Sequence, residues 1–344
     1  MTSTPSAQKV LITTPDYYPK LGGLSRFTQN IEHVLTKLKI PYDLHVWNRY
    51  QDLIASPIST NAYKAMINIH FLGGMSTQGA QIPVLNFFHG SEILFYSPNF
   101  FKHMIKKIQK NRMLRKIEAD DLNIFISEYT LEKIKSLGFR QNVASDLIVH
   151  NGIDCHGARF VSRELNAGPF TLICVARDVP HKNLDGAVSL AKNLYRAIQR
   201  PIKLMLTTTR TWPVSEGVEL VSLGTPSHDS LKKFVSEAHY NLLLSLDHSK
   251  LGFFEGFGLS ALEAGMFGTP TLAFPTGGLP ENIHHGINGH LIQSNHIHDV
   301  EAWFQQLTEI NYRALRVSTF EHTIANHSLE IYEKILTNWQ AIRL

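Results

Sequence analysis

The chain has 344 residues, of which 43% are hydrophobic and 18% are charged, and its formal net charge at pH 7 is +4. This length leaves room for about two domains, and the composition excludes a disordered chain. The small net charge gives no reason to expect nucleic acid as a partner, because proteins that bind it usually show a clustered basic face.

The cysteine content and the ends of the chain bear on where the protein works. The two cysteines, Cys155 and Cys174, are too few for a disulfide framework and fit a reducing cytosol. Residues 1–8 are polar and lack the apolar core of a signal peptide. No apolar run approaches the ~20 residues that a membrane span needs. The sequence therefore predicts a soluble, cytoplasmic protein, in which any membrane contact is made at the surface.

In the first half of the chain, short apolar runs alternate with amphipathic stretches. The apolar residues Phe27, Ile31 and Val34, for example, recur at helical spacing. Such alternation predicts a parallel sheet with helices on both faces. We expect strands at residues 9–14, 42–47, 67–71, 83–88, 122–126 and 147–150, and helices at residues 24–39, 99–119 and 128–137.

A second series of the same kind begins near residue 169. We expect its strands at residues 170–176, 202–207, 240–246 and 271–274, and its helices at residues 184–198, 259–267, 299–308 and 329–342. The polar, aperiodic stretch 154–168 between the two series is interpreted as a linker. The predicted organisation is an N-terminal domain (1–160), a C-terminal domain (161–325) and a last helix (326–344) that returns to the first domain.

The predicted sheets also indicate where to look for function. In open parallel sheets, ligands bind beyond the carboxyl ends of the strands. Two such domains placed face to face would hold their strand-end loops across a shared cleft. Unusual residues in those loops are therefore the candidates for chemistry.

The strongest functional signal is the segment 255–263, which reads Glu-Gly-Phe-Gly-Leu-Ser-Ala-Leu-Glu. Its glycines leave backbone N–H groups bare at the start of a predicted helix, where partial positive charge favours anions. The carboxylates of Glu255 and Glu263 would repel a simple phosphate but accept hydrogen bonds from sugar hydroxyls. A nucleotide sugar, with a central diphosphate and a hydroxylated ring at each end, satisfies both features. In a continuous helix the two carboxylates would lie about 12 Å apart along the axis.

Two other interpretations of this segment remain open. It could be an amphipathic helix with two exposed acids, although Gly256 and Gly258 would weaken an ordinary helix. Residues 256–261 also match the Gly-x-Gly-x-x-Ala fingerprint, which would indicate an NAD-dependent enzyme. That fingerprint should follow a strand directly, whereas residues 247–254 lie between this match and the preceding predicted strand.

Other strand-end loops supply weaker candidates. Gly22 and Gly23 follow the first strand and permit close backbone approach to a ligand, although an ordinary turn would look the same. His89 follows the fourth predicted strand and could hydrogen-bond a sugar hydroxyl or polarise a reacting group, but it is one of 18 histidines. Arg177 and Lys182 share a loop and could bracket a diphosphate, or could simply be solvated.

No metal site is evident, because no Cys–His arrangement has ligand spacing and Asp120-Asp121 lacks an Asp-x-Asp spacing.

Residues 100–117 combine apolar residues with cations and contain no acid. A basic amphipathic helix of this kind is typical of binders of anionic membrane surfaces, although a core-facing helix with a solvated basic face is equally compatible. The cations are Lys102, Lys106, Lys107, Lys110, Arg112, Arg115 and Lys116.

Taken in order, these motifs resemble the retaining glycosyltransferases of GT-B fold, family four (glycosyl transferases group 1). The resemblance spans nearly the whole chain and is most specific from residue 252 to residue 292. It rests on Gly22-Gly23, His89-Gly90, the Asn-Gly-Ile-Asp run at 151–154, Arg177 with Lys182, Glu255 with Glu263, Gly268-Thr-Pro270, Gly277-Gly-Leu-Pro-Glu281 and Gly289-His-Leu-Ile292. The loop that follows residue 176 departs mildly from the family pattern but keeps both cations.

The resemblance implies an α/β fold with two Rossmann-like, doubly wound domains facing across a cleft, and it implies a role for each matched residue. Arg177 and Lys182 would bind the donor diphosphate and stabilise the leaving group, and Glu263 would hold the ribose. The transferred sugar would be held by Glu255 and by the backbone that follows it, while His89 would contact that sugar. Gly22 and Gly23 would approach the phosphate or the acceptor. The residues after Glu255 that would bind substrate are Gly256, Phe257, Gly258 and Leu259.

The sequence therefore predicts a hexosyltransferase that needs no metal or other cofactor. It would move a hexose or N-acetylhexosamine, preferably from a UDP-sugar, to a glycan or glycolipid acceptor such as lipopolysaccharide, capsule or exopolysaccharide. Such an enzyme would be cytoplasmic, with the segment 100–117 as a contact to the inner face of the membrane. The alternative is a subunit that binds a nucleotide sugar, or activates a partner, without turnover.

Overall fold

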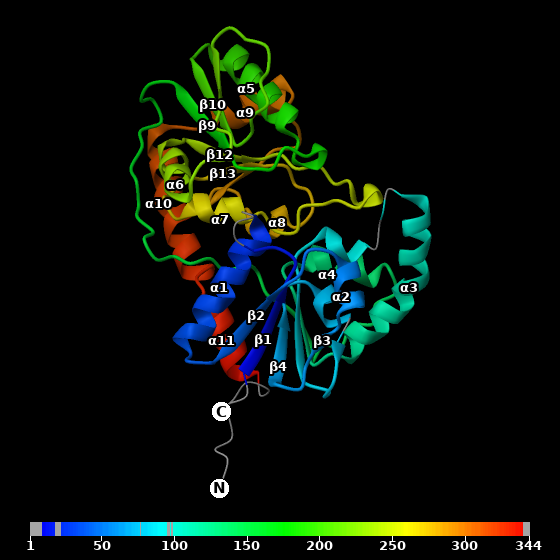
Figure 1. Ribbon diagram of the computed structural model, residues 1–344. Coiled ribbons are helices and arrows are strands. Elements are labelled where there is room, and N and C mark those ends of the chain that lie inside the picture. Colours follow the sequence, from blue (N-terminus) through cyan, green and yellow to red (C-terminus); the bar gives the residue numbers. More distant parts are fainter. Residues whose placement is uncertain (1–8, 18–21, 76, 95–96, 98, 340–344) are drawn as a thin grey trace. The chain divides into compact units, whose positions relative to one another are not determined.

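The computed structural model describes residues 9–17, 22–75, 77–94, 97 and 99–339. It does not describe the side chains of residues 50, 51, 54, 91, 92, 102 and 106–109. The chain forms two compact units, each built around its own sheet (Figure 1). The first unit comprises residues 1–154, 250–252 and 329–344, and the second comprises residues 155–249 and 253–328.

The first unit has a six-stranded sheet of order β2-β1-β4-β6-β7-β8, in which every pair is parallel. A short parallel pair, β3 and β5, lies outside this sheet. The strands are β1 (Lys9–Thr14), β2 (Tyr42–Val46), β3 (Ile58–Ser59), β4 (Tyr63–Asn68), β5 (Thr77–Gln78), β6 (Val84–Phe88), β7 (Leu122–Phe125) and β8 (Asp146–Ile148). The helices are α1 (Gly23–Lys37), α2 (Tyr50–Ala55), α3 (Phe100–Ala119), α4 (Glu128–Lys135) and α11 (Glu330–Asn338), with short 3-10 turns η1 (Phe71–Met75) and η2 (Ser91–Leu94).

The last helix of the chain, α11, belongs to the core of the first unit. Figure 1 shows it beside α1, and its buried residues Tyr332 and Leu336 pack into the same cluster as Phe27, Ile31 and Val34 of α1. The Tyr332 hydroxyl accepts a hydrogen bond from the Gly152 N–H at 2.8 Å. The chain thus returns to the unit in which it began.

The second unit has a six-stranded, wholly parallel sheet of order β11-β10-β9-β12-β13-β14. Its strands are β9 (Phe170–Cys174), β10 (Ile202–Leu206), β11 (Val218–Ser222), β12 (Tyr240–Leu243), β13 (Thr271–Ala273) and β14 (Gly289–Leu291). Its helices are α5 (Leu184–Ile198), α6 (His228–Glu237), α7 (Leu259–Gly265), α8 (Leu279–Asn282), α9 (Ile297–Gln305) and α10 (Glu309–Asn326), with 3-10 turns η3 (Pro180–Lys182) and η4 (Ser249–Leu251). The strands β9, β10, β12 and β13 are almost wholly buried, as expected for a parallel sheet covered on both faces, and this gives the near-continuous apolar runs seen in the sequence.

The predicted doubly wound α/β architecture is confirmed for each unit, and most expected elements lie within a few residues of their predicted places. The strand expected at 67–71 is wrong in position, because β4 ends at Asn68 and the chain then enters η1. Gly73 in η1 approaches β1 so closely that a Cβ there would lie 2.0 Å from Thr13 Oγ1. Phe71 is therefore buried as part of the turn η1 and does not belong to a strand.

Five strands and α-helices of the second unit lie outside the expected ranges, namely β11, β14, α6, α8 and α10. The longest of them, α10, buries Tyr312, Leu315, Arg316, Thr319 and Thr323. Polar side chains occupy most of that buried face, so hydrophobic periodicity does not reveal the helix.

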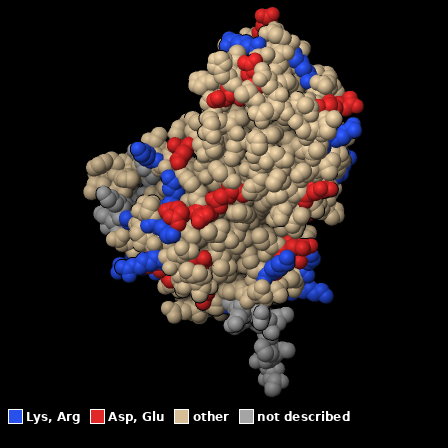
Figure 2. Space-filling view, turned by 180° about the vertical axis from the view of Figure 1, so that it is seen from behind, with Lys and Arg blue, Asp and Glu red and all other residues tan. Residues whose placement is uncertain are grey.

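Among the described residues, no helix is both long and apolar enough to span a bilayer. On the face drawn in Figure 2, acidic and basic side chains are interspersed among uncharged ones. That distribution matches the modest net charge of the sequence.

Candidate active site

The candidate site lies in the second unit, past the carboxyl ends of β9 and β12. These two strands are neighbours, with β10 and β11 continuing on one side and β13 and β14 on the other. The strand order reverses at this point, and ligands of open α/β sheets bind there. Lys182 lies in the loop after β9, and Ser245 and Glu255 follow β12.

A charge pair connects the two loops. The Lys182 ammonium contacts the Glu255 carboxylate, and the Ser245 hydroxyl donates to Glu255 Oε2 at 3.2 Å. The side chains of Lys182 and Glu255 are 19% and 11% exposed. Burial alone would raise the pKa of Glu255, but Lys182 and the Ser245 hydroxyl outweigh it and hold that pKa below its ordinary value. Glu255 is therefore ionised and fixed in place next to a cation.

His181 completes this cluster as a neutral side chain. It is buried, and its ring stacks on that of Phe253 with 5.2 Å between centroids and 7° between planes. Burial, assisted by the neighbouring Lys182 charge, lowers the pKa of His181 to about 4. The ring is consequently uncharged at neutral pH, and the charges of this cluster reside on Lys182 and Glu255.

Glycines set the path of the chain around Glu255. The Gly278 N–H donates to the Glu255 carbonyl at 3.0 Å. Gly277 has a φ of +61°, and a Cβ there would lie 2.2 Å from that same carbonyl oxygen. Gly258 has a φ of +87° at the start of α7, and the Asn282 amide donates to the carbonyls of residues 257 and 258. Only glycine combines these backbone conformations with such close approach.

The helix expected at 259–267 is confirmed as α7 (Leu259–Gly265), so Glu255 and Glu263 do not share one continuous helix. The helix α7 begins at Leu259, because the left-handed conformation of Gly258 interrupts the helical path. Glu263 lies on the helix, whereas Glu255 precedes it in an irregular turn. The Phe257 side chain is 1% exposed and belongs to the core. At position 257 a ligand would therefore contact backbone.

Arg177 is exposed at the start of the loop that Lys182 ends. The loop is fixed at its far end by Asn183, whose amide donates to the Leu244 carbonyl at 3.0 Å. The Asn183 carbonyl of the side chain also accepts from the Gly186 N–H and so caps α5.

The first unit carries the remaining predicted residues. Gly22 precedes α1, and its N–H donates to Ser25 Oγ at 2.9 Å, while Gly23 is the first residue of the helix. His89 follows β6, and its ring lies 4.3 Å from that of Phe27 on α1. Burial lowers the pKa of His89 to about 3, with a smaller effect from His70. The imidazole is therefore neutral at neutral pH.

The basic segment 100–117 lies within α3. Near its start, Phe100, Phe101 and Met104 are exposed by 69%, 76% and 47%, whereas Met113 and Ile117 near its end are buried. The side chains of Lys102, Lys106 and Lys107 lie outside the described residues. The helix thus combines a core-facing end with an end that exposes apolar side chains.

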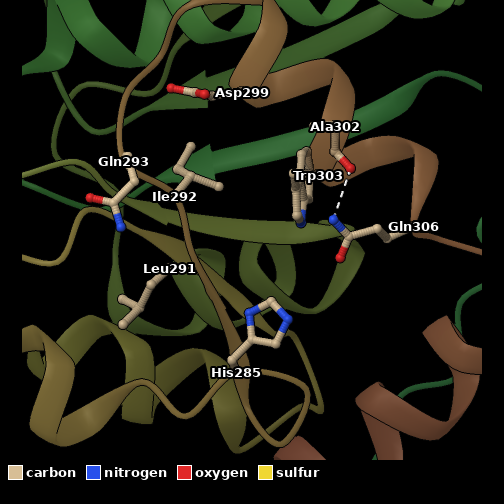
Figure 3. A pocket seen from close by; sticks show the side chains of 8 residues that line it. All are labelled: His285, Leu291, Ile292, Gln293, Asp299, Ala302, Trp303 and Gln306. Carbon is tan, nitrogen blue, oxygen red and sulfur yellow. Dashed lines mark hydrogen bonds between the residues drawn. The ribbon is translucent and has the colours of Figure 1, made fainter.

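A separate pocket of about 180 Å³ lies beside β14 and α9 (Figure 3). Figure 3 shows Trp303 and Gln306 on one side of it and His285 below them. None of the residues predicted for the site lines it. Across the part of the chain that the structure describes, no group of three or more His, Cys, Asp or Glu side chains is arranged to hold a metal ion.

Sequence reasoning missed Ser245, His181 and Phe253 as parts of the site. Ser245 falls within the strand expected at 240–246, whereas β12 ends at Leu243. A shorter strand would have placed Ser245 among the strand-end residues. No sequence signal indicated that His181 would stack on Phe253.

Several known proteins are similar to this chain. Residues 158–318 match the family model described as Glycosyl transferases group 1. An uncharacterized glycosyltransferase of Methanocaldococcus jannaschii is 23% identical over 89% of this chain and 90% of its own length. Anabaena HepE, solved in complex with UDP and glucose, superposes with a TM-score of 0.69 at 15% identity over 95% of this chain and 98% of HepE.

Sucrose-phosphate synthase from Thermosynechococcus elongatus gives a TM-score of 0.71 at 15% identity, covering 96% of this chain and 97% of that protein. These likenesses confirm the predicted GT-B class of α/β fold, with two Rossmann-like domains. The family match and the archaeal relative make the chain similar to glycosyltransferases, and the solved structures give it their GT-B fold.

Proposed function

We propose that the protein is a retaining hexosyltransferase of family four. It moves a hexose or N-acetylhexosamine from a nucleotide-diphosphate sugar, preferably a UDP-sugar, to a glycan or glycolipid acceptor such as lipopolysaccharide, capsule or exopolysaccharide. The observation that carries the proposal is the pair of Lys182 and Glu255 at the reversal point of the second sheet, supported by Ser245.

The charges of this pair suit the reaction. When a nucleoside diphosphate leaves, negative charge builds on its phosphates, and cations already in place stabilise it. Lys182 and Arg177 take that role in the proposal. Glu255 accepts hydrogen bonds from hydroxyls of the transferred sugar, and Glu263 accepts them from the ribose. The N–H groups of residues 256–259 contribute further donors to the donor substrate.

The first unit is proposed to serve the acceptor side, as an N-terminal domain of residues 1–160, with residues 161–325 as the donor domain and 326–344 as the returning helix. Gly22 and Gly23 permit close backbone approach to a phosphate or to the acceptor. A neutral His89 can donate or accept a hydrogen bond with a sugar hydroxyl without a change of charge.

The proposal includes no metal or other cofactor, because Arg177 and Lys182 supply the positive charge that a divalent cation would otherwise bring to the diphosphate. It also includes no covalent glycosyl intermediate. Retention would follow from attack by the acceptor on the same face from which the diphosphate departs.

The preference for a UDP-sugar rests on similar proteins. Anabaena HepE has been solved with UDP, with UDP and glucose and with UDP-glucose. These are properties of HepE, and they make UDP-glucose the first donor to try with this chain.

We further propose a cytoplasmic enzyme that docks on anionic lipid through residues 100–117. The exposed Phe100 and Phe101 would enter the interface, and the neighbouring lysines would attract lipid headgroups. Charge reversal at Lys106, Lys107 and Lys110 should abolish sedimentation with phosphatidylserine vesicles. Absence of binding by the unaltered protein would refute the docking.

The main experiment is a thermal-unfolding screen against UDP-, GDP-, ADP- and dTDP-sugars. A donor at 100 times its dissociation constant should stabilise the protein by about 2.7 kcal/mol. Replacing Lys182 with Ala should remove the shift given by the best donor and reduce release of its nucleoside diphosphate by about 10²-fold or more.

The matched control is Lys203→Ala, which removes a lysine of the same unit that pairs with Glu219 at 3.7 Å on the surface. This variant should retain both the shift and the turnover. If no donor stabilises the unaltered protein and none is turned over, the proposed function is wrong. If a donor binds without turnover under every acceptor tried, the protein is a binding subunit.

A further inference from the structure

A second charged cluster lies next to the loop of Arg177, and neither the sequence motifs nor the proposed mechanism uses it. The strands β9 and β10 are parallel neighbours, so the loops that follow them lie side by side. Arg210, in the loop after β10, lies 3.7 Å from Asp178 Oδ1 and forms an ion pair with Asp185. One guanidinium thus pairs with two carboxylates of the segment that carries Arg177 and Lys182.

Neighbouring side chains hold this arrangement in place. The Thr208 hydroxyl donates to Asp178 Oδ2 at 2.9 Å, and the Trp212 indole N–H donates to Asp185 Oδ1 at 2.7 Å. The Arg210 guanidinium lies 4.7 Å from the centre of the Trp212 ring. A planar cation stacked on an indole and hydrogen-bonded to carboxylates has a defined orientation, which a lysine would not reproduce in full.

Contacts with the loop after β10 also fix the backbone on each side of Arg177. The Ala176 N–H donates to Thr207 Oγ1, and that hydroxyl donates to the Ala176 carbonyl, each at 2.9 Å. Asp178 is held on the other side by Thr208 and Arg210. The Arg210 carbonyl in turn accepts from Ser222 Oγ at 2.6 Å. Arg177 therefore projects from a segment whose two flanking residues are both anchored to the loop after β10.

Charge gives this arrangement a consequence for anion binding. Lys182 is already paired with Glu255, whereas Arg177 is the exposed cation of this loop. Asp178 is its direct neighbour, and an uncompensated carboxylate there would repel a diphosphate. Arg210 neutralises that carboxylate.

We propose that Arg210 is a positioning residue for the donor diphosphate, which it serves by neutralising Asp178 and Asp185 and by fixing the segment from which Arg177 projects. This inference rests on the proposed function, because it assumes that Arg177 meets the diphosphate. Arg210 itself does not touch the substrate.

The test is the dissociation constant of the donor's nucleoside diphosphate, with UDP as the probe, measured by calorimetry for a set of variants. Arg210→Leu should weaken UDP binding about tenfold, and Arg210→Lys should restore most of it. Asp178→Asn added to Arg210→Leu should recover part of the lost affinity, because the repelling charge next to Arg177 is then absent while Asp185 stays uncompensated. A residue needed only for folding would show no such rescue.

Arg200→Leu is the matched control. Arg200 lies before β10, at the opposite end of the strand, where it hydrogen-bonds the carbonyls of Leu165 and Gly168. Its loss should leave UDP binding unchanged even where it lowers the unfolding temperature. Unchanged binding by Arg210→Leu, or a double variant no better than Arg210→Leu, would overturn the inference. Failure of the unaltered protein to bind any nucleoside diphosphate would instead count against the proposed function.

Discussion

The two sheets of this protein have the same architecture but keep their polar groups in different places. Each has six parallel strands, and each reverses its strand order beside its first strand, at β1 in one unit and β9 in the other. In the first unit a row of polar side chains crosses the interior of the sheet. In the second unit the polar side chains gather beyond the ends of the strands, around Lys182 and Glu255.

The row in the first unit is continuous and satisfied. Its members lie in register on five adjacent strands: Thr13, Asn68, Asn86, Asn123 and Asp146. Their hydrogen bonds, in that order, measure 2.6, 2.9, 3.0 and 2.8 Å. All are buried. Because these groups bind one another, they stabilise and align the strands, whereas the charges of the second unit lie where a ligand binds.

Glu255→Gln tests the functional side of this comparison and has the largest expected effect. The variant keeps the shape of the side chain but removes the charge that pairs with Lys182. Transfer should fall about 10²- to 10³-fold, because an interaction with the reacting sugar is lost. Affinity for the bare nucleoside diphosphate should rise roughly tenfold, or about 1.4 kcal/mol, since Lys182 is released to bind phosphate. Steady-state kinetics and calorimetry measure the two quantities.

Ser245→Ala is the control for Glu255→Gln. It removes the neutral hydrogen bond to the same carboxylate and leaves the charges as they are. It should therefore lower transfer modestly without raising affinity for the nucleoside diphosphate. Weaker nucleoside diphosphate binding by Glu255→Gln would show that the pair assists anion binding, contrary to the assignment made above.

Asn86→Ala tests the structural side, with Asn241→Ala as its counterpart in the second unit. Asn86 is 1% exposed and bonds Asn68, Asn123 and Asp120. Asn241 is fully buried but donates only to Thr271 Oγ1, at 3.2 Å, and its own carbonyl oxygen is buried without a partner. Loss of Asn86 leaves several buried groups unsatisfied and should cost about 3 kcal/mol of unfolding free energy, against about 1 kcal/mol for Asn241.

Native-state hydrogen exchange is the suitable measurement, because it reports the two units separately. Amides of β4 and β6 should lose protection in Asn86→Ala, and those of β12 should change less in Asn241→Ala. Equal losses in the two variants would show that the row contributes no more than an ordinary buried pair.

The sequence predicts the central strands of both sheets well because they are buried and read as apolar runs, whereas β11, which is largely unburied, lies outside the predicted strands. The sequence does not predict elements whose buried side chains are polar. The buried face of α10 contains Arg316, which donates to the carbonyls of Val161 and Phe267, so the helix lacks an apolar stripe. The polar row escapes detection for the same reason, since Asn68 and Asn86 interrupt strands that otherwise appear apolar.

For the site, the motifs indicate which residues to examine but not how those residues meet. The glycines around Glu255 predict an irregular backbone, yet the contact with Lys182 joins residues 73 positions apart. Such pairing depends on which strands are neighbours, and strand order cannot be read from local patterns. The Arg210 cluster shows the same limit, because it depends on the adjacency of β9 and β10.

The smallest expected effect concerns pH and Asp120, which accepts a hydrogen bond from a member of the polar row. Asp120 accepts from the Asn86 amide at 2.8 Å, and burial raises its pKa from 3.8 to about 6. The folded state therefore binds the proton of Asp120 more tightly than the unfolded state does. The stabilisation of the fold by this protonated carboxyl is complete below pH 3.8 and is lost as the pH rises through about 6. Asp120→Asn removes this dependence, so the variant should gain stability relative to the unaltered protein between these pH values and keep a constant advantage above them.

Comparing the two proteins at each pH isolates this effect, because the buried histidines titrate in both. Burial lowers the pKa of His89 from 6.5 to about 3. The stability that the neutral His89 contributes to the fold is therefore present above pH 6.5 and is lost on acidification. That loss is common to variant and unaltered protein and cancels in the difference. Hydrogen exchange of β6 amides between pH 4 and pH 7, corrected for intrinsic rates, should show the difference changing with pH. A difference independent of pH would mean that Asp120 is ionised in the folded state throughout, and that Asn86 donates to a charged carboxylate.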